Sequence, residues 1–287
     1  MFNPSNTVDR PPGAVNYYLP TIPNFHPSMH CPLCTTEPGA DPASGRPERT
    51  SAAGLSRDSN LTGLVSADRI TRPPDRPSGP GDTGHESAAG LVSADGRPFR
   101  WCPTCWLVYY TGASYPNREE ERLRYETHNN ESDDPGYQSF LRRAIAPIGD
   151  FLHPGMRALD YGSGPGPAMP VVLGDLGISC SLYDPIYAPE KPEGLFDLIT
   201  CTETFEHFHR PAESLRHING LLAAGGLLAV MTEQWTDLSR FGRWYYTRDE
   251  THVCFYHHET FNWIAEEFGF KVLHDDRRRV VCMQKTN

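Results

Sequence analysis

Positive charge is scarce in this sequence of 287 residues. Lysine and arginine together number 26, against 36 aspartate and glutamate residues, so the formal net charge is -10. A chain with this balance has no overall basic field to attract nucleic acid, although a local basic patch would remain compatible with it. The charge therefore disfavours a nucleic-acid partner without excluding one.

Long apolar runs are also absent. No window approaches the twenty or so apolar residues that a membrane-spanning helix needs. The N-terminus, Met-Phe-Asn-Pro, lacks the basic segment followed by an apolar one that marks a secretory signal. We therefore expect no membrane contact and a cytoplasmic location. In such a reducing compartment, paired cysteines indicate metal ligation rather than disulfides.

Two common phosphate-binding motifs are missing as well. The glycine-rich stretch at residues 157–167 reads Arg-Ala-Leu-Asp-Tyr-Gly-Ser-Gly-Pro-Gly-Pro, which is neither the G-x-G-x-x-G of a dinucleotide site nor a phosphate loop with Gly-Lys-Ser/Thr. The short apolar run ending in Asp160 predicts a buried strand, a tight turn and a helix with Pro167 at its first position. Because glycine lets the backbone approach a ligand closely, this turn is typical of a binding site.

A second acidic residue ends the next expected strand. Residues 178–183 are followed by Asp184, twenty-four positions after Asp160. In a doubly wound sheet, this is the place of the carboxylate that accepts hydrogen bonds from ribose hydroxyls. Without a diphosphate motif, the two features together predict a nucleoside ligand that carries no diphosphate.

The motifs that follow complete an ordered series. Phe-Asp-Leu-Ile-Thr stands at residues 196–200 and Leu-Ala-Ala-Gly-Gly at residues 222–226. With the glycine-rich turn and Asp184, this series resembles the class I S-adenosyl-L-methionine (SAM) dependent methyltransferases over roughly the last half of the chain. The resemblance implies an α/β fold, a Rossmann-like doubly wound sheet at residues 156–287, and SAM as cofactor. It also implies the cofactor-binding residues: Asp160, Gly162, Ser163, Gly164, Gly166, Asp184 and Thr202.

The pattern departs from that family in one place. Only about a dozen residues separate Asp184 from the strand expected at residues 196–201, which is too few for a strand and a helix. We therefore expect the family's third strand, and its adenine-contacting acid, to be shortened or absent. The remaining expected elements are a helix at 211–222 stopped by Gly225 and Gly226, a strand at 227–232, a helix at 261–268, and strands at 270–273 and 280–283.

Four of the eight cysteines form two Cys-Pro-x-Cys pairs: Cys31 with Cys34, and Cys102 with Cys105. Two such pairs predict a structural Zn²⁺ held by four thiolates, with no open position for catalysis. The alternative is four independent thiols. We expect a zinc ribbon at residues 26–112, and we expect the remaining cysteines to lie in the core because their surroundings are apolar: Cys180, Cys201, Cys254 and Cys282.

The segment between the cysteine pairs is far longer than a zinc ribbon needs. Ser51–Leu55 recurs as Ser87–Leu91, among many Pro, Gly, Ser, Asp and Arg residues. Such a composition cannot bury enough apolar surface to offset the entropy of ordering, so residues 37–97 are predicted to be a disordered insert. Residues 1–25 are predicted to be a flexible arm. Residues 113–155 are predicted to be a helical linker that roofs the cofactor, with Tyr125, His128 and Asn129 as candidate lining residues.

Ionisable side chains cluster in the loop after residues 196–201. The loop reads Thr-Glu-Thr-Phe-Glu-His from Thr202, and its residues Glu203, Glu206 and His207 are spaced so that one helical turn would bring them to the same side. His207 could act as a general base. Alternatively, the cluster could hold Mg²⁺ or a similar divalent cation. A third interpretation gives Glu206 and His207 only the structural role of ordering the loop.

The Glu-x-x-Glu-His arrangement is similar to that of small-RNA 3′-end and ubiquinone-biosynthesis O-methyltransferases. In those families it is associated with a metal and with a later histidine. The candidates for that histidine here are His252, His257 and His258, and spacing does not decide among them. The whole chain resembles bacterial zinc-ribbon methyltransferases grouped with the ubiquinone-type methylases.

Residues 240–249, which combine aromatics with arginines, stand where this family builds the lid over its acceptor. They could stack on the acceptor, or Trp244 and Tyr245 could pack in the core. Arg277, Arg278 and Arg279 are expected in a solvated hairpin turn. We expect a SAM-dependent methyltransferase acting on a hydroxyl or other nucleophile of a small-molecule acceptor, with or without a metal. The alternatives are an RNA-modifying methyltransferase that docks through the ribbon, and a non-catalytic SAM- and zinc-binding module.

Overall fold

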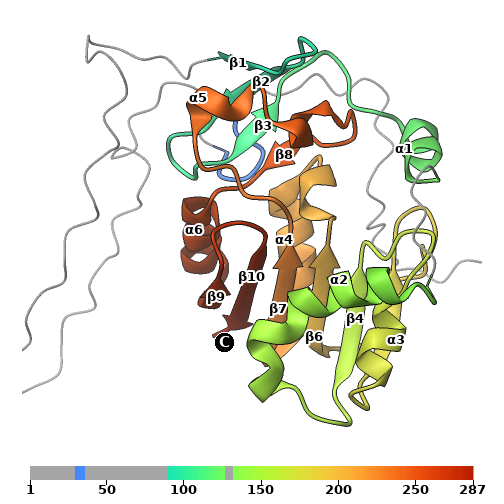
Figure 1. Ribbon diagram of the computed structural model, residues 1–287. Helices are drawn as coiled ribbons and strands as arrows, with labels where there is room; N and C mark the ends of the chain where they lie inside the picture. The colour runs from blue at the N-terminus through green and yellow to red at the C-terminus, as the bar shows by residue number, and fades with distance from the viewer. Residues whose placement is uncertain (1–29, 36–89, 127–131, 287) are drawn as a thin grey trace, which may run out of the picture.

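The computed structural model describes residues 30–35, 90–126 and 132–286, and its largest element is a six-stranded mixed sheet (Figure 1). The predicted arm at residues 1–25 and most of the predicted insert lie outside these residues. The strands run in the order β5-β4-β6-β7-β10-β9. The first four pair in parallel, and β10 is antiparallel to both of its neighbours. Their bounds are β4 Arg157–Tyr161, β5 Ser179–Tyr183, β6 Phe196–Thr202, β7 Leu222–Met231, β9 Phe270–Asp275 and β10 Val280–Lys285.

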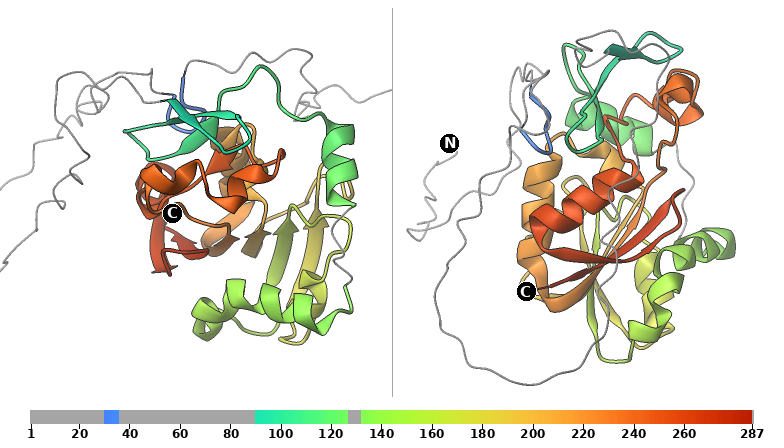
Figure 2. Two further views of the ribbon diagram at one scale, coloured as in Figure 1. Left: turned by 45° about the horizontal axis from the view of Figure 1, so that its top comes forward. Right: turned by 90° about the vertical axis from the view of Figure 1, so that its left-hand side faces the viewer.

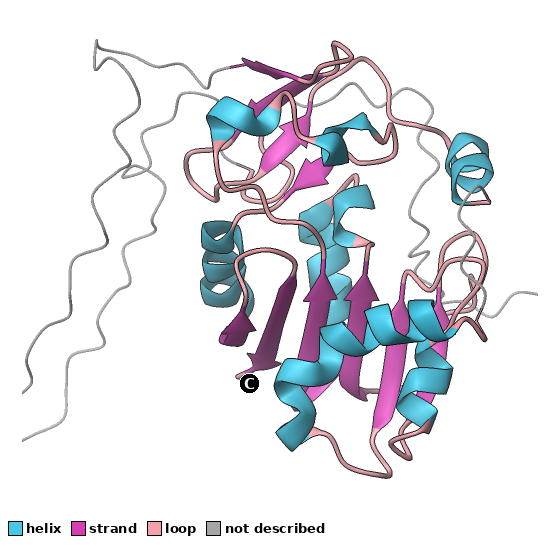
Figure 3. Ribbon diagram, in the orientation of Figure 1, coloured by secondary structure: helices cyan, strands magenta, loops and turns pink. Residues whose placement is uncertain are grey.

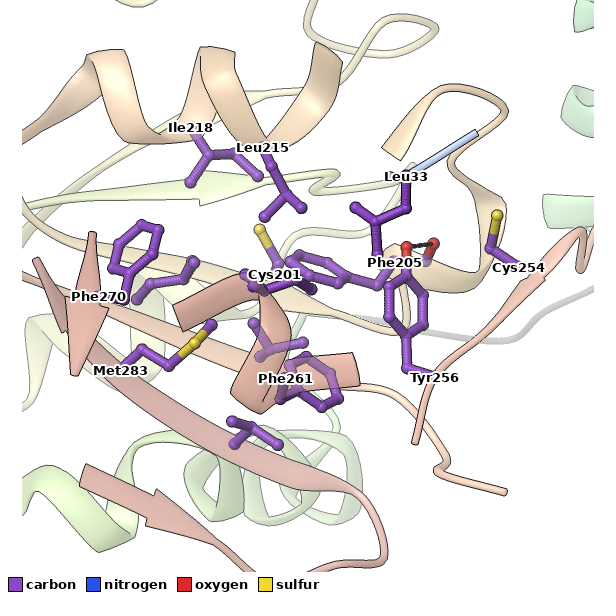
Figure 4. Packing of buried hydrophobic residues seen from close by; sticks show 14 of the residues in the cluster. Leu33, Cys201, Phe205, Leu215, Ile218, Cys254, Tyr256, Phe261, Phe270 and Met283 are labelled. Atoms are coloured by element: carbon purple, nitrogen blue, oxygen red, sulfur yellow. Dashed lines mark hydrogen bonds between the residues drawn. The ribbon is translucent and has the colours of Figure 1, made fainter. Parts of the chain in front are cut away.

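Helices cover both faces of this sheet (Figure 3), as its apolar central strands require. Alternate side chains of one strand enter different cores: Leu159 of β4 packs with α4 (Pro211–Leu221) and α6 (His258–Phe268), and Ala158 packs with α2 (Pro135–Ile145) and α3 (Met169–Gly174). Figure 4 shows part of the first core, in which Leu215 and Phe261 meet the sheet. The structure is therefore an α/β Rossmann-like fold with the expected doubly wound cover.

The strand and helix order of the family is confirmed, including its expected gap. Residues 184–195, all of them described, contain no strand or helix and form only one isolated bridge, between Asp184 and Ala188. As a result β5 lies at the edge of the sheet. The third strand of the family is therefore missing here.

Two local predictions are wrong. Helix α3 begins at Met169 instead of at Pro167, because the turn continues through positive φ angles at Gly162 and Gly164 and reaches helical geometry only near Ala168. Gly225 and Gly226 do not separate a helix from a strand. They lie inside β7, which starts at Leu222 and bulges against β6 between its pairings with Phe196 and Leu198.

A second, four-stranded antiparallel sheet lies beyond the carboxyl ends of β6 and β7 (Figure 1). It has the order β1-β2-β3-β8, with β1 at Gly90–Val92, β2 at Pro98–Trp101, β3 at Val108–Tyr110 and β8 at Cys254–Phe255. The segment after the second cysteine pair thus shares a sheet with a strand close to the C-terminus. No local sequence pattern predicts that these two segments join.

Residues 90–97 do not belong to a disordered insert, contrary to expectation. They form β1 and the turn into β2, in which the amide of Arg97 donates to the Ser93 hydroxyl at 3.0 Å and the amide of Gly96 donates to the Ser93 carbonyl at 3.0 Å. Local hydrogen bonds and contacts with distant residues compensate for a composition that predicts disorder.

The remaining helices are short. Helix α1 (Arg118–Tyr125) begins with a capping box formed by Asn117 and Glu120, and α2 begins after Asp134, whose side chain accepts from the Gly136 amide. The others are η1 Ala146–Phe151, η2 Phe205–His207, α5 Leu238–Phe241 and η3 Tyr245–Arg248. Within the described residues, none of the helices has the length and apolar character needed to cross a membrane.

Candidate active site

A cavity of about 1950 Å³ opens at the carboxyl ends of β4, β5 and β6. Its wall brings together four segments that are far apart in the sequence: the glycine-rich turn after β4, the loop after β6, helix α1, and the segment between η3 and β8. In an open α/β sheet this is where ligands bind. All seven residues predicted to bind the cofactor line the cavity: Asp160, Gly162, Ser163, Gly164, Gly166, Asp184 and Thr202.

The glycine-rich turn has the shape of a cradle. Gly162 has a φ of 81°, its amide donates to the Tyr183 carbonyl at 2.7 Å, and a Cβ there would lie 2.3 Å from Cγ2 of Thr204. At Gly164 a Cβ would meet no atom within 4 Å, so the turn faces open space. The hydroxyl of Ser163 is buried and has no partner among the described residues. An unpaired hydroxyl beside an open turn fits a polar ligand such as SAM.

Asp184 lines the cavity but is already partly engaged. One carboxylate oxygen accepts from the amides of Ile186 at 2.8 Å and Tyr187 at 3.0 Å, and the other accepts from the Gly164 amide at 3.0 Å. Since a carboxylate oxygen accepts two hydrogen bonds, Oδ2 retains one position for a ribose hydroxyl. Asp184 therefore fixes the glycine turn and keeps one acceptor position in the wall of the cavity.

Asp160 is more deeply buried and has a different environment. The hydroxyl of Thr200 donates to its carboxyl group at 2.9 Å, and burial raises the pKa of Asp160 to about 7. The neighbouring β6 strand thus holds this side chain at the floor of the cavity.

The loop after β6 separates its two glutamates. Glu203 takes a left-handed backbone conformation with φ of 49°, which is strained for a residue with a Cβ, and its carboxylate accepts from Arg279 at 2.7 Å. Glu206 is fully buried in η2. One of its oxygens accepts from the Tyr246 hydroxyl, and the other, Oε2, has no partner among the described residues. Only Glu206 therefore presents an unused carboxylate oxygen.

Two histidines face this glutamate with the same arrangement. Nδ1 of His207 lies 3.1 Å from the Thr251 carbonyl, and Nδ1 of His252 lies 2.8 Å from the Tyr246 carbonyl. Because a carbonyl only accepts, each Nδ1 carries the proton and each Nε2 keeps its lone pair. The two rings are 4.9 Å apart. Both imidazoles are thus held in the tautomer that binds metals through Nε2.

Glu206, His207 and His252 offer one ligand atom each, and these atoms all lie within 4.8 Å of one another. Glu203 is outside this group. The other candidate histidines lie elsewhere: Nδ1 of His257 caps α6, and His258 pairs with Glu259. Of the three histidines that the sequence left open, the structure therefore brings His252 to the loop.

Burial dominates the electrostatics of this cluster. It raises the pKa of Glu206 to about 7, and burial together with the nearby Glu206 raises that of Glu203 to about 7. Burial also lowers the pKa of His207, and burial and the neighbouring His207 lower that of His252 to about 3. The histidines are therefore neutral at physiological pH, as metal ligands must be.

Three residues of the site were not found from the sequence. Arg279 was assigned to a solvated turn, but its guanidinium also contacts Glu203 and Glu233 and lines the cavity. Tyr246 is buried against Glu206, and Arg97 reaches the segment that carries His252. These contacts join residues forty or more positions apart, so no local signal marks them.

The predicted acceptor lid divides between the core and the cavity. Trp244 packs against an aromatic core with Phe241 and Phe255, and Tyr245 lines the cavity with more than half of its surface exposed. Tyr125 of α1 lines the cavity as well, whereas His128 and Asn129 lie outside the described residues.

The four paired cysteines meet at the turn that joins β2 to β3. Sγ of Cys31 lies 3.4 Å from that of Cys105, Sγ of Cys34 lies 3.5 Å from that of Cys102, and all four sulfurs lie within 4.8 Å of one another. None of them forms a disulfide. Zinc with Zn–S bonds of about 2.3 Å would separate tetrahedral sulfurs by roughly 3.8 Å, which this cluster matches. Of the other four cysteines, Cys180 is half-buried, and Cys201, Cys254 and Cys282 lie in the core.

The sheet and the glycine-rich turn identify the fold of this chain as that of the class I SAM-dependent methyltransferases. In agreement, residues 136–275 match a family model described as "Methyltransferase domain", so the chain carries a domain of this methyltransferase family. No curated protein sequence matches the chain.

Several solved methyltransferase structures are similar to this chain. One is the 1,6-didemethyltoxoflavin-N1-methyltransferase of Burkholderia thailandensis, with S-adenosylhomocysteine bound (14% identity, 70% of this chain and 100% of that one, TM-score 0.46). A candidate SAM-dependent methyltransferase from Methanococcus maripaludis is another (15% identity, 61% of this chain and 98% of that one, TM-score 0.42). A third is the magnesium protoporphyrin IX methyltransferase of Synechocystis (14% identity, 61% of this chain and 90% of that one, TM-score 0.36).

Proposed function

We propose that this protein transfers the methyl group of SAM to a hydroxyl of a small-molecule acceptor, assisted by a divalent metal held by Glu206, His207 and His252. The observation that carries the proposal is the convergence of an unpaired carboxylate oxygen and two oriented imidazoles in the wall of the cavity that contains the glycine-rich turn. A SAM-binding module without catalysis would have no need for such a cluster.

The cofactor fits the glycine-rich turn. Gly164 leaves space where a side chain would intrude, Ser163 offers an unpaired hydroxyl, and Asp184 retains an acceptor position for the ribose. SAM supplies the methyl group and a good leaving group, so the protein mainly has to align the acceptor with the methyl carbon.

The donor set of the metal site suggests the kind of ion. Two imidazoles and one carboxylate suit a transition metal such as Mn²⁺, Fe²⁺, Co²⁺ or Zn²⁺, whereas Mg²⁺ prefers oxygen ligands. The sequence had suggested Mg²⁺ because it placed Glu203 in the same cluster, but Glu203 pairs with Arg279. When bound, the ion would lower the pKa of an acceptor hydroxyl and fix its position.

The second sphere of the site supports the metal interpretation over the general-base one. Both imidazoles donate Nδ1–H to backbone carbonyls, an arrangement that orients metal-binding histidines. A general base would require only one of these rings, and would leave the paired geometry of His252 and the unused oxygen of Glu206 without a role.

The cavity favours a small molecule over RNA. Aromatic side chains line it, and charges of both signs are interspersed among them, with ion pairs such as Arg124–Asp249 at 2.7 Å. A site for nucleic acid would present a continuous basic surface. The phenylalanine and tyrosine residues that line it are Tyr115, Tyr125, Tyr137, Phe140, Tyr161, Tyr183, Phe208, Tyr245 and Tyr246.

We further propose that the four paired cysteines hold a structural Zn²⁺. The four sulfurs lie within 4.8 Å of one another, which supports this proposal. Cys31, Cys102 and Cys105 are also buried, so that without a metal their thiols would have no contact with solvent. A site closed by four protein ligands would contribute to folding and not to methyl transfer.

The experiment that tests the proposed function measures S-adenosylhomocysteine release. The purified protein is stripped of metal by a chelator, given back one equivalent of zinc for the four thiolates, and screened against hydroxyl-bearing acceptors with and without added Mn²⁺ or Mg²⁺. We expect turnover that depends on metal, that Mn²⁺ supports better than Mg²⁺, and that Glu206→Gln abolishes. Glu266→Gln, an exposed glutamate on α6, is the matched control and should retain full activity. Turnover that is equal with and without metal would refute the metal-assisted mechanism.

A further inference from the structure

Arg97 connects the turn between β1 and β2 to the segment that precedes β8. Its guanidinium donates four hydrogen bonds to backbone carbonyls about 150 residues away. Nη1 lies 2.9 Å from the carbonyl oxygen of Thr247 and 2.7 Å from that of Asp249. Nη2 lies 2.9 Å from those of both Glu250 and His252. Figures 1 and 2 show the two segments side by side.

The same backbone segment orients both histidines of the proposed metal site. The carbonyl of Tyr246 accepts from Nδ1 of His252, and the carbonyl of Thr251 accepts from Nδ1 of His207. Three of the four carbonyls that Arg97 binds, those of Thr247, Glu250 and His252, belong to residues directly beside these two in the sequence. A shift of this backbone would therefore turn both imidazoles at once.

The position of the guanidinium is itself well defined. It lies 5.1 Å from the ring centre of Phe99 and 5.0 Å from that of Tyr110, so its cation is held over two neighbouring rings of the paired strands β2 and β3. A planar fork with several donors can satisfy four carbonyls in a fixed geometry, whereas the single ammonium group of lysine cannot. Arg97 does not itself line the cavity.

We propose that Arg97 is a positioning residue for the metal site. It fixes the backbone at residues 247–252, and through the carbonyls of Tyr246 and Thr251 it directs Nε2 of His252 and His207 toward Glu206. This inference rests on the proposed metal-assisted function. It also gives the small sheet a role in methyl transfer, because the turn that carries Arg97 belongs to that sheet.

The test compares Arg97→Met and Arg97→Lys with the wild type and with Arg243→Met. Arg243 is an exposed arginine near the same segment that does not line the cavity. Hydrogen exchange of residues 245–253 is measured on the metal-free protein, and Mn²⁺ and SAM affinities are measured by titration. We expect Arg97→Met to speed exchange in this segment and to weaken Mn²⁺ binding by roughly 10–100-fold, as removal of an outer-sphere partner does, while SAM affinity stays within about twofold.

Rescue separates positioning from general stability. Guanidinium ion at millimolar concentration should restore part of the Mn²⁺ affinity of Arg97→Met, and Arg97→Lys should not recover it. Arg243→Met should behave as the wild type. If Arg97→Met binds Mn²⁺ as tightly as the wild type, or exchanges no faster at residues 245–253, the proposal is overturned. A wild type that binds no Mn²⁺ would refute the metal site itself, and the exchange data would still report whether Arg97 holds the segment.

Discussion

Replacing Gly162 by alanine should be far more damaging than the same change at Gly164. Both residues have positive φ angles, 81° and 63°, so an added Cβ costs roughly 1–2 kcal/mol at either position. At Gly162 the Cβ would also lie 2.3 Å from Cγ2 and 3.0 Å from Cβ of Thr204. Overpacking of this kind adds about 1–3 kcal/mol. We therefore expect about 2–5 kcal/mol for Gly162→Ala and only about 1–2 kcal/mol for Gly164→Ala.

The assay is urea unfolding followed by circular dichroism, with Gly149→Ala as control. Gly149 has no positive φ, and a Cβ there would meet nothing within 4 Å, so its change should be neutral or slightly stabilising. In Gly162→Ala/Thr204→Ala part of the clash is removed, so the two changes should cost less together than the sum of their separate costs. Equal losses for Gly162→Ala and Gly164→Ala would refute the close approach of the turn to Thr204.

Gly164→Ala, the variant that costs less stability, should nevertheless weaken SAM binding. The methyl group of Gly164→Ala would project into the open side of the turn, where no protein atom lies within 4 Å. We expect this variant to lose SAM affinity while most of its stability remains. Unchanged affinity, measured by calorimetry, would place the cofactor away from Gly164.

Four further predictions concern charge and metal. Burial raises the pKa of Glu206 to about 7, so Mn²⁺ affinity should rise with pH up to about 7 and then level off, whereas a midpoint near 5 would contradict that burial. Without metal, the raised pKa of Glu206 stabilises the fold fully below pH 4.5 and loses this contribution toward pH 7, whereas the lowered pKa values of His207 and His252 act in the opposite sense. The Tm of the wild type should therefore fall relative to that of Glu206→Gln over that range, and Mn²⁺ should reverse the fall. Arg279→Met should lower the free energy of unfolding by roughly 1–3 kcal/mol, because it leaves two carboxylates without their ion-pair partner, and the exposed Arg278→Met should lower it by almost nothing. Similar midpoints of urea unfolding for the two variants would contradict this. Cys105→Ser should lose the zinc detected by mass spectrometry and lower Tm, whereas zinc retained at the wild-type ratio would exclude the four-thiolate site.

The elements of the sheet could be predicted because their signals are local. Single stretches of sequence contain the apolar run before Asp160, the glycines after it, and the short distance from Asp184 to residues 196–201. The bounds of β4, β5 and β6 agree closely with the strands that these features predict. Boundaries were less predictable. The start of α3 depends on how far the backbone of the turn continues beyond Gly164.

The metal cluster was only partly predictable. The motif placed Glu203, Glu206 and His207 together, but a left-handed backbone at Glu203 and its bond to Arg279 take that carboxylate out of the group. The choice of His252 depends on where β8 pairs with β3, which is a long-range contact.

The most direct test of the account is the stoichiometry of Mn²⁺ binding in two histidine variants. His252→Asn removes a proposed ligand, and His258→Asn changes a histidine only six positions later that pairs with Glu259 on α6. Electron paramagnetic resonance of protein given one equivalent of zinc, which the four thiolates should take first, should find one tightly bound Mn²⁺ per chain in the wild type and in His258→Asn, and none in His252→Asn. Equal Mn²⁺ binding by the two variants would contradict the assignment of Glu206, His207 and His252 as the metal site.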